Sequence, residues 1–255
     1  MMAFKRSAMV FSIMALASFA GIARAGTTNI AVAANFTDAA KEIASAFKAK
    51  SGHEAILSFG ASGQIYTQIQ QSAPYKVFLS ADDERPKKLA EEGLAIQGSR
   101  FTYAIGKLVL WSKDQDLIKG EETLKANAFS KLSIANPSAA PYGAAAIEVL
   151  EALNLYGTIK TKIVMGNTIA QAFQFVETGN AEIGFVSLSQ ITGNKAGSRW
   201  MVPQSLYTPI RQDAILLKNG ETDDASREFI SFLKGPEARA IIEKYGYVMD
   251  AKSGS

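Results

Sequence analysis

Four residues in this sequence, Asn35, Ser62, Tyr142 and Ile169, stand where a helix is expected to begin shortly after an apolar run. Asn and Ser are typical of the first positions of helices. The free backbone N–H groups at a helix start carry partial positive charge and point along the helix axis. Taken alone, each is an ordinary helix start, but such a start can also bind an anion. The pattern therefore indicates an anion site if several of these starts face one point.

The elements that must position these residues are strands, each followed by a helix. The four apolar runs are residues 30–34, 55–59, 132–135 and 162–165. Helical spacing follows them, as in Ile65 and Ile69, which are four residues apart. Strands alternate with helices throughout, which predicts an α/β fold with open sheets. Ligands of such sheets bind outside the carboxyl ends of the strands, where all four helix starts are expected.

The chemistry offered by these four positions is hydrogen-bond donation without a cation. Each helix start contributes roughly half an elementary charge, so four together present about +2, which matches a dianion. A fully ionised tetrahedral dianion only accepts hydrogen bonds. Hydrogen phosphate also carries a proton, and burying it without an acceptor costs about 1–3 kcal/mol. The Asn35 side-chain oxygen and Asp38 are acceptors in this region, and we expect Asp38 to point away from the site or to cap its own helix.

Several other kinds of site are disfavoured. The sequence has neither G-x-x-x-x-G-K-[ST] nor G-x-G-x-x-G, the glycine-rich nucleotide-binding motifs. It has no Cys and one His, so no Cys/His cluster for a transition-metal cation is expected. An exported hydrolase using Ser62 would need a base and, for a G-x-S-x-G motif, Gly at Gln64. We expect the single histidine, His53, to be a surface residue between two elements.

Residues 1–25 have the pattern of a secretory signal peptide. Lys5 and Arg6 are basic, 8–20 is an apolar core, and Ala23-Arg24-Ala25 is a typical cleavage signal, so export and a mature chain starting at Gly26 are expected. The formal net charge of +3 falls to near zero without the three basic residues of this segment, which gives no support to a nucleic-acid or membrane partner. Without Cys, neither a disulfide nor a lipid anchor is expected.

Taken together, the ordered motifs of the chain resemble those of periplasmic molybdate-binding proteins, the soluble receptors of molybdate ABC transporters. The resemblance covers essentially the whole chain after residue 25. The matching segments are Ala33-Ala34-Asn35-Phe36-Thr37-Asp38-Ala39, Ser58-Phe59-Gly60-Ala61-Ser62-Gly63, Phe78-Leu79-Ser80-Ala81-Asp82, Leu233-Lys234-Gly235-Pro236-Glu237-Ala238 and Lys244-Tyr245-Gly246-Tyr247.

The resemblance implies a two-lobed type II periplasmic binding protein fold, with two mixed sheets flanked by helices and a ligand cleft between the lobes. One lobe would comprise residues 26–105 and 212–255, and the other residues 106–211. The implied ligand is molybdate, with tungstate as a second, and the implied partner is an inner-membrane ABC permease. The protein would be a monomer without a cofactor, and molybdenum would be bound only as molybdate. The implied ligand residues are Asn35, Ser62, Tyr142 and Ile169, the last through its backbone N–H.

The chain departs from many members of this family at Ser187, where they have a ligand tyrosine. We expect Tyr142 to supply that hydroxyl from the other side and Ser187 to be a bystander. Whether Ser187 or Ala34 contacts the ligand stays open at this point. Other functions also stay open: a receptor for sulfate, thiosulfate or a small organic anion, the exported hydrolase, and the effector domain of a transcription regulator, which shares this fold.

Overall fold

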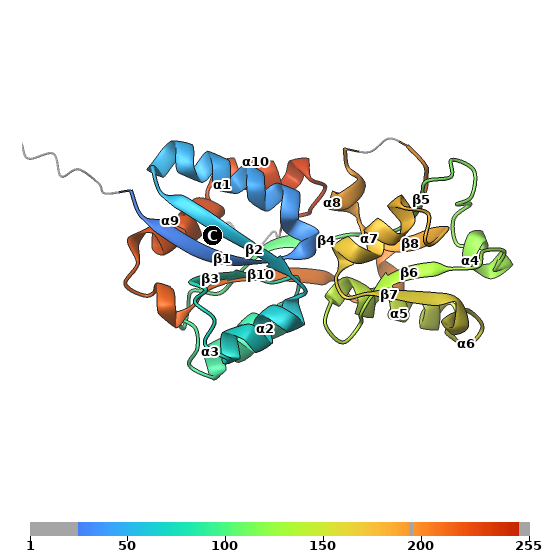
Figure 1. Ribbon diagram of the computed structural model, residues 1–255, viewed down its shortest axis with the longest axis horizontal. Coiled ribbons are helices and arrows are strands. Elements are labelled where there is room, and N and C mark those ends of the chain that lie inside the picture. The colour runs from blue at the N-terminus through green and yellow to red at the C-terminus, as the bar shows by residue number, and fades with distance from the viewer. Residues whose placement is uncertain (1–24, 194–195, 250–255) are drawn as a thin grey trace, which may run out of the picture.

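The computed structural model describes residues 25–193 and 196–249, and residues 1–24 of the expected signal peptide lie outside them. The chain folds into two lobes that lie side by side, each built on a five-stranded sheet (Figure 1). Among the described residues, no helix combines the length and the apolar character that crossing a membrane requires.

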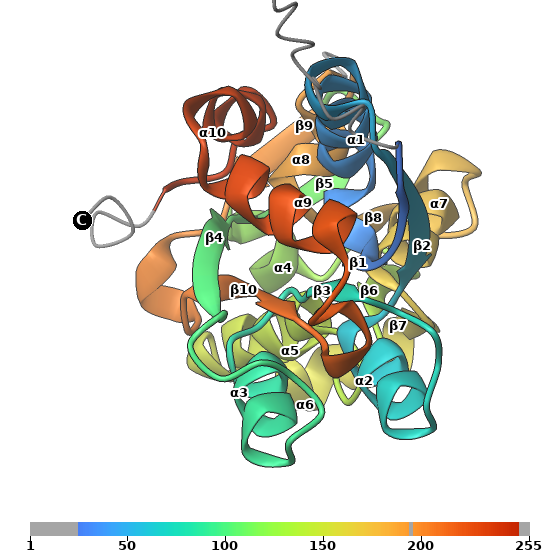
Figure 2. The same cartoon turned by 90° about the vertical axis from the view of Figure 1, so that its left-hand side faces the viewer.

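The first lobe contains both ends of the described chain. Its elements are β1 (Thr27–Ala33), η1 (Ala34–Phe36), α1 (Thr37–Ser51), β2 (Glu54–Gly60), α2 (Ser62–Gln70), β3 (Val77–Leu79), α3 (Glu84–Glu91), β4 (Phe101–Gly106), β10 (Ile210–Leu216), η4 (Lys218–Gly220), α9 (Asp224–Lys234) and α10 (Pro236–Lys244). The strand order is β2-β1-β3-β10-β4, with β1 parallel to β2 and β3 and with β10 antiparallel to its neighbours. Helices α1, α9 and α10 cover one face of the sheet, and α2 and α3 cover the other (Figures 1 and 2).

The second lobe is formed by the middle of the chain. Its elements are β5 (Leu108–Ser112), α4 (Glu122–Ala126), β6 (Leu132–Ala135), α5 (Pro141–Ala152), α6 (Tyr156–Ile159), η2 (Lys160–Lys162), β7 (Ile163–Gly166), α7 (Ile169–Glu177), β8 (Ile183–Ser187), α8 (Leu188–Ile191), β9 (Ser198–Met201) and η3 (Gln204–Leu206). The strand order is β7-β6-β8-β5-β9, in which β6 is parallel to β7 and β8, whereas β5 is antiparallel to β8 and β9. Both sheets are therefore mixed.

The chain crosses between the lobes twice. Lys107 alone separates β4 from β5, and residues 202–209 connect β9 to β10. By sheet membership the first lobe ends at Gly106 and resumes at Ile210, and we place the lobe boundaries there. The expected limits of 105 and 212 cut one residue from the end of β4 and two residues from the start of β10. Both crossings lie at the same edge of each sheet, because β4 and β9 are edge strands and β10 and β5 lie next to them.

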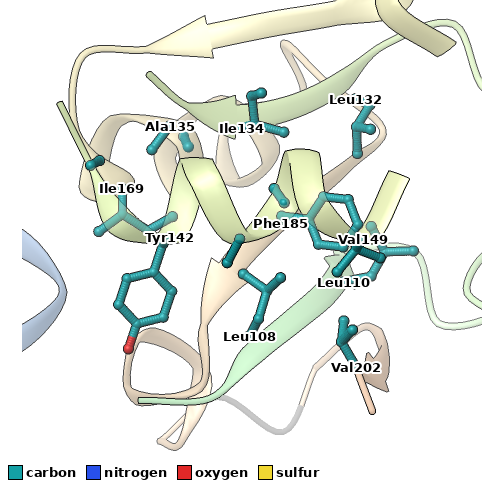
Figure 3. Close-up of a cluster of buried hydrophobic side chains, with 14 of the residues drawn as sticks. Leu108, Leu110, Leu132, Ile134, Ala135, Tyr142, Val149, Ile169, Phe185 and Val202 are labelled. Carbon is teal, nitrogen blue, oxygen red and sulfur yellow. The ribbon is translucent and has the colours of Figure 1, made fainter. Parts of the chain in front are cut away.

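Each lobe has its own apolar core. In the first lobe, Ile43 and Phe47 on the inner face of α1 are fully buried, and Phe47 packs edge to face on Phe229 of α9 at 5.2 Å between ring centroids. In the second lobe, α5 packs on β5, β6 and β8 through a cluster that contains Leu110, Ile134 and Phe185 (Figure 3). The two cores make each lobe a rigid body, which is what a hinge between them requires.

The prediction that His53 is a surface residue is wrong. His53 is only 6 % exposed, its Nδ1 accepts the backbone N–H of Gly26 at 2.8 Å, and its ring stacks on Phe47. Spacing along the chain did not show that α1 and α9 would cover it.

Removing the Phe47 ring should destabilise the first lobe. Phe47→Ala leaves a cavity among Phe229, Phe232 and Ile43, and buried Phe→Ala changes cost about 3–5 kcal/mol of unfolding free energy. Ile56→Ala is the control, because Ile56 is 49 % exposed and its loss should change stability by less than about 0.5 kcal/mol. Urea unfolding measures both variants, and equal effects would contradict the described core.

Candidate functional site

The four helix starts singled out from the sequence meet at one cavity between the lobes. Its walls are small side chains and backbone together with these four residues; the lining residues are Ala33, Ala34, Asn35, Gly60, Ala61, Ser62, Ala81, Ala140, Pro141, Tyr142 and Ile169. The cavity volume is about 10 Å³, far below the roughly 300–1,000 Å³ of sites for drug-sized ligands. With the lobes closed the cavity suits only a small, compact guest, which has to enter while they are open.

Asn35 lies in η1, directly after β1, and is 4 % exposed. It does not cap a helix: Phe36 occupies the N-cap position of α1, and the start of η1 has no side-chain cap either. The Asn35 amide nitrogen instead donates to Gln212 Oε1 at 2.8 Å and to the Tyr247 hydroxyl at 3.0 Å. Asn35 thus lies near the start of α1, where a helix start was expected, but its side chain caps no helix, because buried partners take both amide protons. What η1 presents to the cavity is backbone N–H groups of its first turn, which have no acceptor within a helix.

Ser62 is the first residue of α2, and Ala61 rather than Ser62 occupies the N-cap position. The Ser62 side chain is buried, and its Oγ accepts the backbone N–H of Ala81 at 2.9 Å. Its own proton therefore remains to be donated, and Ser62 lines the cavity. His53 precedes β2 whereas Ser62 follows it, so the only histidine lies about one strand length, roughly 20 Å, from the serine and cannot act as its base.

Tyr142 is the second residue of α5 and follows Pro141 at the first position. Proline lacks a backbone N–H, but at the first position of a helix this group has no acceptor within the helix in any case. Figure 3 shows the ring at the end of the apolar cluster with its oxygen directed away from the labelled aliphatic side chains. The hydroxyl accepts from Ser187 Oγ at 3.0 Å and from Gln212 Nε2 at 3.2 Å. Burial raises the pKa of Tyr142 well above its ordinary value, so the hydroxyl keeps its proton. Only glycine fits opposite, since a Cβ on Gly106 would lie 2.0 Å from this oxygen.

Ile169 is the first residue of α7, and its side chain belongs to the core of the second lobe (Figure 3). The helix is capped by Thr168, whose side chain accepts the Gln171 N–H at 3.1 Å. Ile169 has no polar side-chain atom, so its backbone N–H is the group it offers to the cavity. The four expected site residues thus lie together, with Ala34 beside Asn35 in the same wall.

Ser187 is not among the residues that line the cavity, so its expected role as a bystander toward the ligand stays a prediction, but it contacts Tyr142. Ser187 is fully buried, caps α8, and donates to the Tyr142 hydroxyl. Sequence reasoning also missed Gln212 and Tyr247, which hold Asn35 from behind. The one available signal was the polar pair Gln212-Asp213, directly before the apolar run 214–217.

No lining residue of the cavity is cationic, so hydrogen-bond donors and helix starts supply its positive potential. Asp38 points away, as expected: its side chain is 64 % exposed and lies 3.9 Å from Lys41. Arg85 of α3 lies outside the cavity, where it pairs with Asp82. Among the described residues, no three His, Cys, Asp or Glu side chains are grouped to hold a metal ion.

The lobes touch on both sides of the cavity, so the structure is in a closed state. The Gly63 N–H of α2 donates to the Ala139 carbonyl at 2.9 Å, and Arg85 Nη2 donates to the Ser138 carbonyl at 3.1 Å. Ser189 Oγ of α8 donates to the Asn35 carbonyl at 2.8 Å. The Gly63 and Arg85 contacts join α2 and α3 to residues 138–139 of the other lobe and form when the cleft is shut, whereas Ser189 lies next to the crossing at Lys107, whose carbonyl accepts the Leu188 N–H.

Comparison with known proteins agrees with this architecture. A family model described as "Bacterial extracellular solute-binding protein" matches residues 28–248. The chain belongs to this family. The solute-binding protein is 54 % identical to "Molybdate-binding protein ModA" of Rhodobacter capsulatus over 89 % of this chain and 90 % of the relative. It is 53 % identical to the protein of the same name from Azotobacter vinelandii, over 88 % and 91 %.

A solved structure extends the comparison to three dimensions. The Azotobacter vinelandii periplasmic molybdate-binding protein superposes with a TM-score of 0.85 and 41 % identity, covering 88 % of this chain and 99 % of that one. The expected two-lobed type II fold, with two mixed sheets flanked by helices, is thereby confirmed. This solute-binding protein is a receptor and not an enzyme, which removes the hydrolase hypothesis.

Gly63 provides a test of the closed arrangement. A Cβ at this position would lie 3.1 Å from Ala139 Cα and 3.2 Å from its carbonyl oxygen, both in the other lobe. Gly63→Ala should therefore weaken binding of molybdate, the ligand named for the relatives, by about fivefold or more, since overpacking costs about 1–3 kcal/mol. Stability without ligand should stay the same or rise slightly, because Ala favours helices.

Gly157→Ala is the matched control, because a Cβ there meets nothing within 4 Å. Calorimetric titration and thermal unfolding give the two quantities. Unchanged affinity in Gly63→Ala would mean that the lobes do not close on a ligand as described.

Proposed function

We propose that this protein is a periplasmic receptor that binds molybdate and delivers it to the permease of an ABC importer. The observation that carries the proposal is the convergence of four helix starts on one small cavity without a cationic side chain. High identity over almost the whole length to two proteins named as molybdate-binding supports the choice of anion. The molybdenum would be bound only as the oxyanion, through Asn35, Ser62, Tyr142 and Ile169, with no cofactor.

The donors of the site match a fully ionised tetrahedral dianion. Ser62 accepts the Ala81 N–H and Tyr142 accepts two further hydrogen bonds, so both hydroxyls have a proton to give to an anion. The η1 and α7 starts add backbone N–H groups, which are fixed in place by the fold. The four oxygens of molybdate only accept hydrogen bonds. Every donor of the site therefore finds an acceptor, and molybdate carries no proton that would face a donor. Burial of such charge-assisted bonds away from water makes them strong.

The small lining residues explain why the backbone can reach a small ion. Ala33, Ala34, Ala61, Ala81 and Ala140 have no side chain beyond Cβ, so helix starts from both lobes approach one point. Opening at the two crossings would separate Asn35 and Ser62 of the first lobe from Tyr142 and Ile169 of the second. An anion between them would favour the closed state, which is the form that a permease can recognise.

Tungstate has the same charge and shape, and we propose that it binds too. Sulfate is also a tetrahedral dianion, so its rejection has to come from the size of the closed cavity. We further propose that the protein is exported by its leader, is cleaved after Ala25, and acts as a monomer. Intact mass of the periplasmic protein tests the cleavage site, and light scattering tests the monomer.

Titration with four salts tests the ligand. Molybdate and tungstate should bind tightly by calorimetry at neutral pH, while sulfate and phosphate should bind at least about a hundredfold more weakly. Sulfate should bind weakly because it does not contact all the donors at once. Hydrogen phosphate should bind weakly because its proton meets no acceptor. Sulfate binding as tight as molybdate binding would overturn the assignment to molybdate.

The Tyr142 hydroxyl should carry a measurable share of the affinity. Tyr142→Phe removes one hydrogen bond to a charged group, which contributes about 1.5–3 kcal/mol, so molybdate should bind about tenfold to a hundredfold more weakly. Tyr156→Phe is the control, since Tyr156 lies in α6 away from the cavity. If Tyr142→Phe bound molybdate as tightly as the control, Tyr142 would not be a ligand.

A further inference from the structure

One of the motifs singled out in the sequence, Phe78-Leu79-Ser80-Ala81-Asp82, is only partly used by the anion cavity, to which it contributes Ala81. Its last residue, Asp82, is a carboxylate whose side chain is only 15 % exposed. Asp82 forms an ion pair with Arg85, the second residue of α3, whose side chain is 23 % exposed. Neither of the two lines the cavity, so this partly buried pair needs another explanation.

The Asp82 carboxylate holds Arg85 with both of its oxygens. Oδ1 accepts the Arg85 backbone N–H at 2.9 Å, and Oδ2 accepts from Nη1 of the guanidinium. Because the guanidinium is planar and is held at Nη1, the position of its other terminal nitrogen is restricted as well. This nitrogen, Nη2, donates to the Ser138 carbonyl of the second lobe at 3.1 Å. Asp82 thus orients the bond that Arg85 makes across the cleft.

The acceptor belongs to a turn that is fixed within the second lobe. The Ser138 N–H donates to Asn136 Oδ1 at 3.0 Å, and the Ala140 N–H donates to the Asn136 carbonyl at 2.9 Å. The N–H of Asn136 itself donates to the Gly166 carbonyl at 2.8 Å. Ala140 is the N-cap residue of α5 and lines the anion cavity. A bond to the Ser138 carbonyl therefore holds a turn that forms part of the cavity wall.

A second donor of the first lobe reaches the same turn. The Gly63 N–H donates to the Ala139 carbonyl at 2.9 Å, next to the bond between Arg85 and Ser138. The two contacts are close neighbours, since a Cβ on Gly63 would lie 3.1 Å from Arg85 Nη2. Opening of the cleft would break both contacts, whereas the ion pair of Arg85 with Asp82 lies within one lobe and would persist. Arg85 therefore stays oriented for the next closure.

The surroundings of Arg85 argue against a role in attracting the anion. Residues 82–88 carry three acidic and three basic side chains, so their formal net charge is zero. Arg85 lines two hollows of the cleft, with volumes of about 310 and 450 Å³. The smaller one shares Ala81 and Pro141 with the anion cavity. An anion that leaves the cavity on this side would pass Arg85.

We propose that Arg85 stabilises the closed cleft through its bond to the Ser138 carbonyl and thereby limits the rate at which the anion leaves. Asp82 is a positioning residue that acts through Arg85. This inference rests on the proposed function, since it concerns the release of the same anion. Because the bond across the cleft exists only when the lobes are closed, it slows opening and leaves association nearly unchanged.

Removing the donor should speed release. Arg85→Met keeps much of the aliphatic stem but has no donor, so the dissociation rate constant of molybdate should rise about threefold to tenfold, as expected for one partly exposed hydrogen bond. The association rate constant should stay within about twofold. Arg85→Lys keeps the charge but lacks the planar fork that reaches Asp82 and Ser138 together, so it should release molybdate nearly as fast as Arg85→Met.

A change at Asp82 tests the positioning role. Asp82→Asn keeps the oxygen that accepts the Arg85 backbone N–H and removes the charge that holds the guanidinium, so release should again become faster. The double variant Asp82→Asn/Arg85→Met should release molybdate no faster than Arg85→Met alone, because Asp82 acts through Arg85. Independent effects that multiply would contradict this role. Asp82→Asn also keeps the test available if Arg85→Met folds poorly.

Arg227→Met is the matched control. Arg227 also pairs with an aspartate three residues earlier, Asp224, and donates to a backbone carbonyl, that of Glu221 at 3.1 Å, but all three residues lie in the first lobe. Its release rate should equal that of the unaltered protein. Release is measured by loading each protein with radioactive molybdate and adding an excess of unlabelled molybdate. Calorimetric titration gives the dissociation constant, and the two values together give the association rate constant.

Unchanged release from Arg85→Met, with molybdate still bound tightly by the unaltered protein, would overturn this inference while the proposed function stands. Slower association in Arg85→Met that Arg85→Lys restores would mean that the charge attracts the anion, and this result would overturn the inference too. Failure of the unaltered protein to bind molybdate would overturn both the inference and the proposed function.

Discussion

The cavity has to balance the negative charge of an anion without a cationic side chain, and the arrangement of the fold follows from this requirement. The cavity has no cationic lining residue, so any positive potential comes from helix starts and from hydroxyl protons. A single helix start is weak, and several have to meet to balance a dianion. The two sheets supply them because the carboxyl ends of β1 and β2 in one lobe, and of β6 and β7 in the other, face the same cleft. The fold is thus a means of bringing backbone N–H groups together.

Donors without charge have to be held in one orientation, and here buried neighbours hold them. The Ala81 N–H occupies Ser62 Oγ, while Ser187 and Gln212 occupy the Tyr142 oxygen. Ser187 of β8 belongs to the same lobe as Tyr142, whereas Gln212 of β10 reaches Tyr142 from the other lobe. Gly106, at the end of β4, leaves the space that this contact needs. Tyr142 is thus held by one neighbour from each lobe.

The general plan of the molecule could be predicted from the sequence, since apolar runs followed by helical spacing mark the strand–helix units. Asn35, Ser62, Tyr142 and Ile169 were found because each follows such a run. What each side chain does could not be predicted. The partner of Asn35 is Gln212, which is 177 positions away, and the partner of Ser187 is Tyr142, at 45 positions. Local spacing predicts that Asn35 stands near a helix start, but it does not show that the side chain is taken up by Gln212 and Tyr247 instead of a cap.

The central claim is that uncharged donors from four helix starts surround the anion. Crystals grown with molybdate would test it most directly, because anomalous scattering locates the molybdenum atom. The account predicts one strong peak inside the cavity, with anion oxygens at about 2.7–3.1 Å from the hydroxyls of Ser62 and Tyr142 and from the first-turn N–H groups of η1 and α7. A peak beside Arg85, outside the cavity, with the cavity empty, would contradict it.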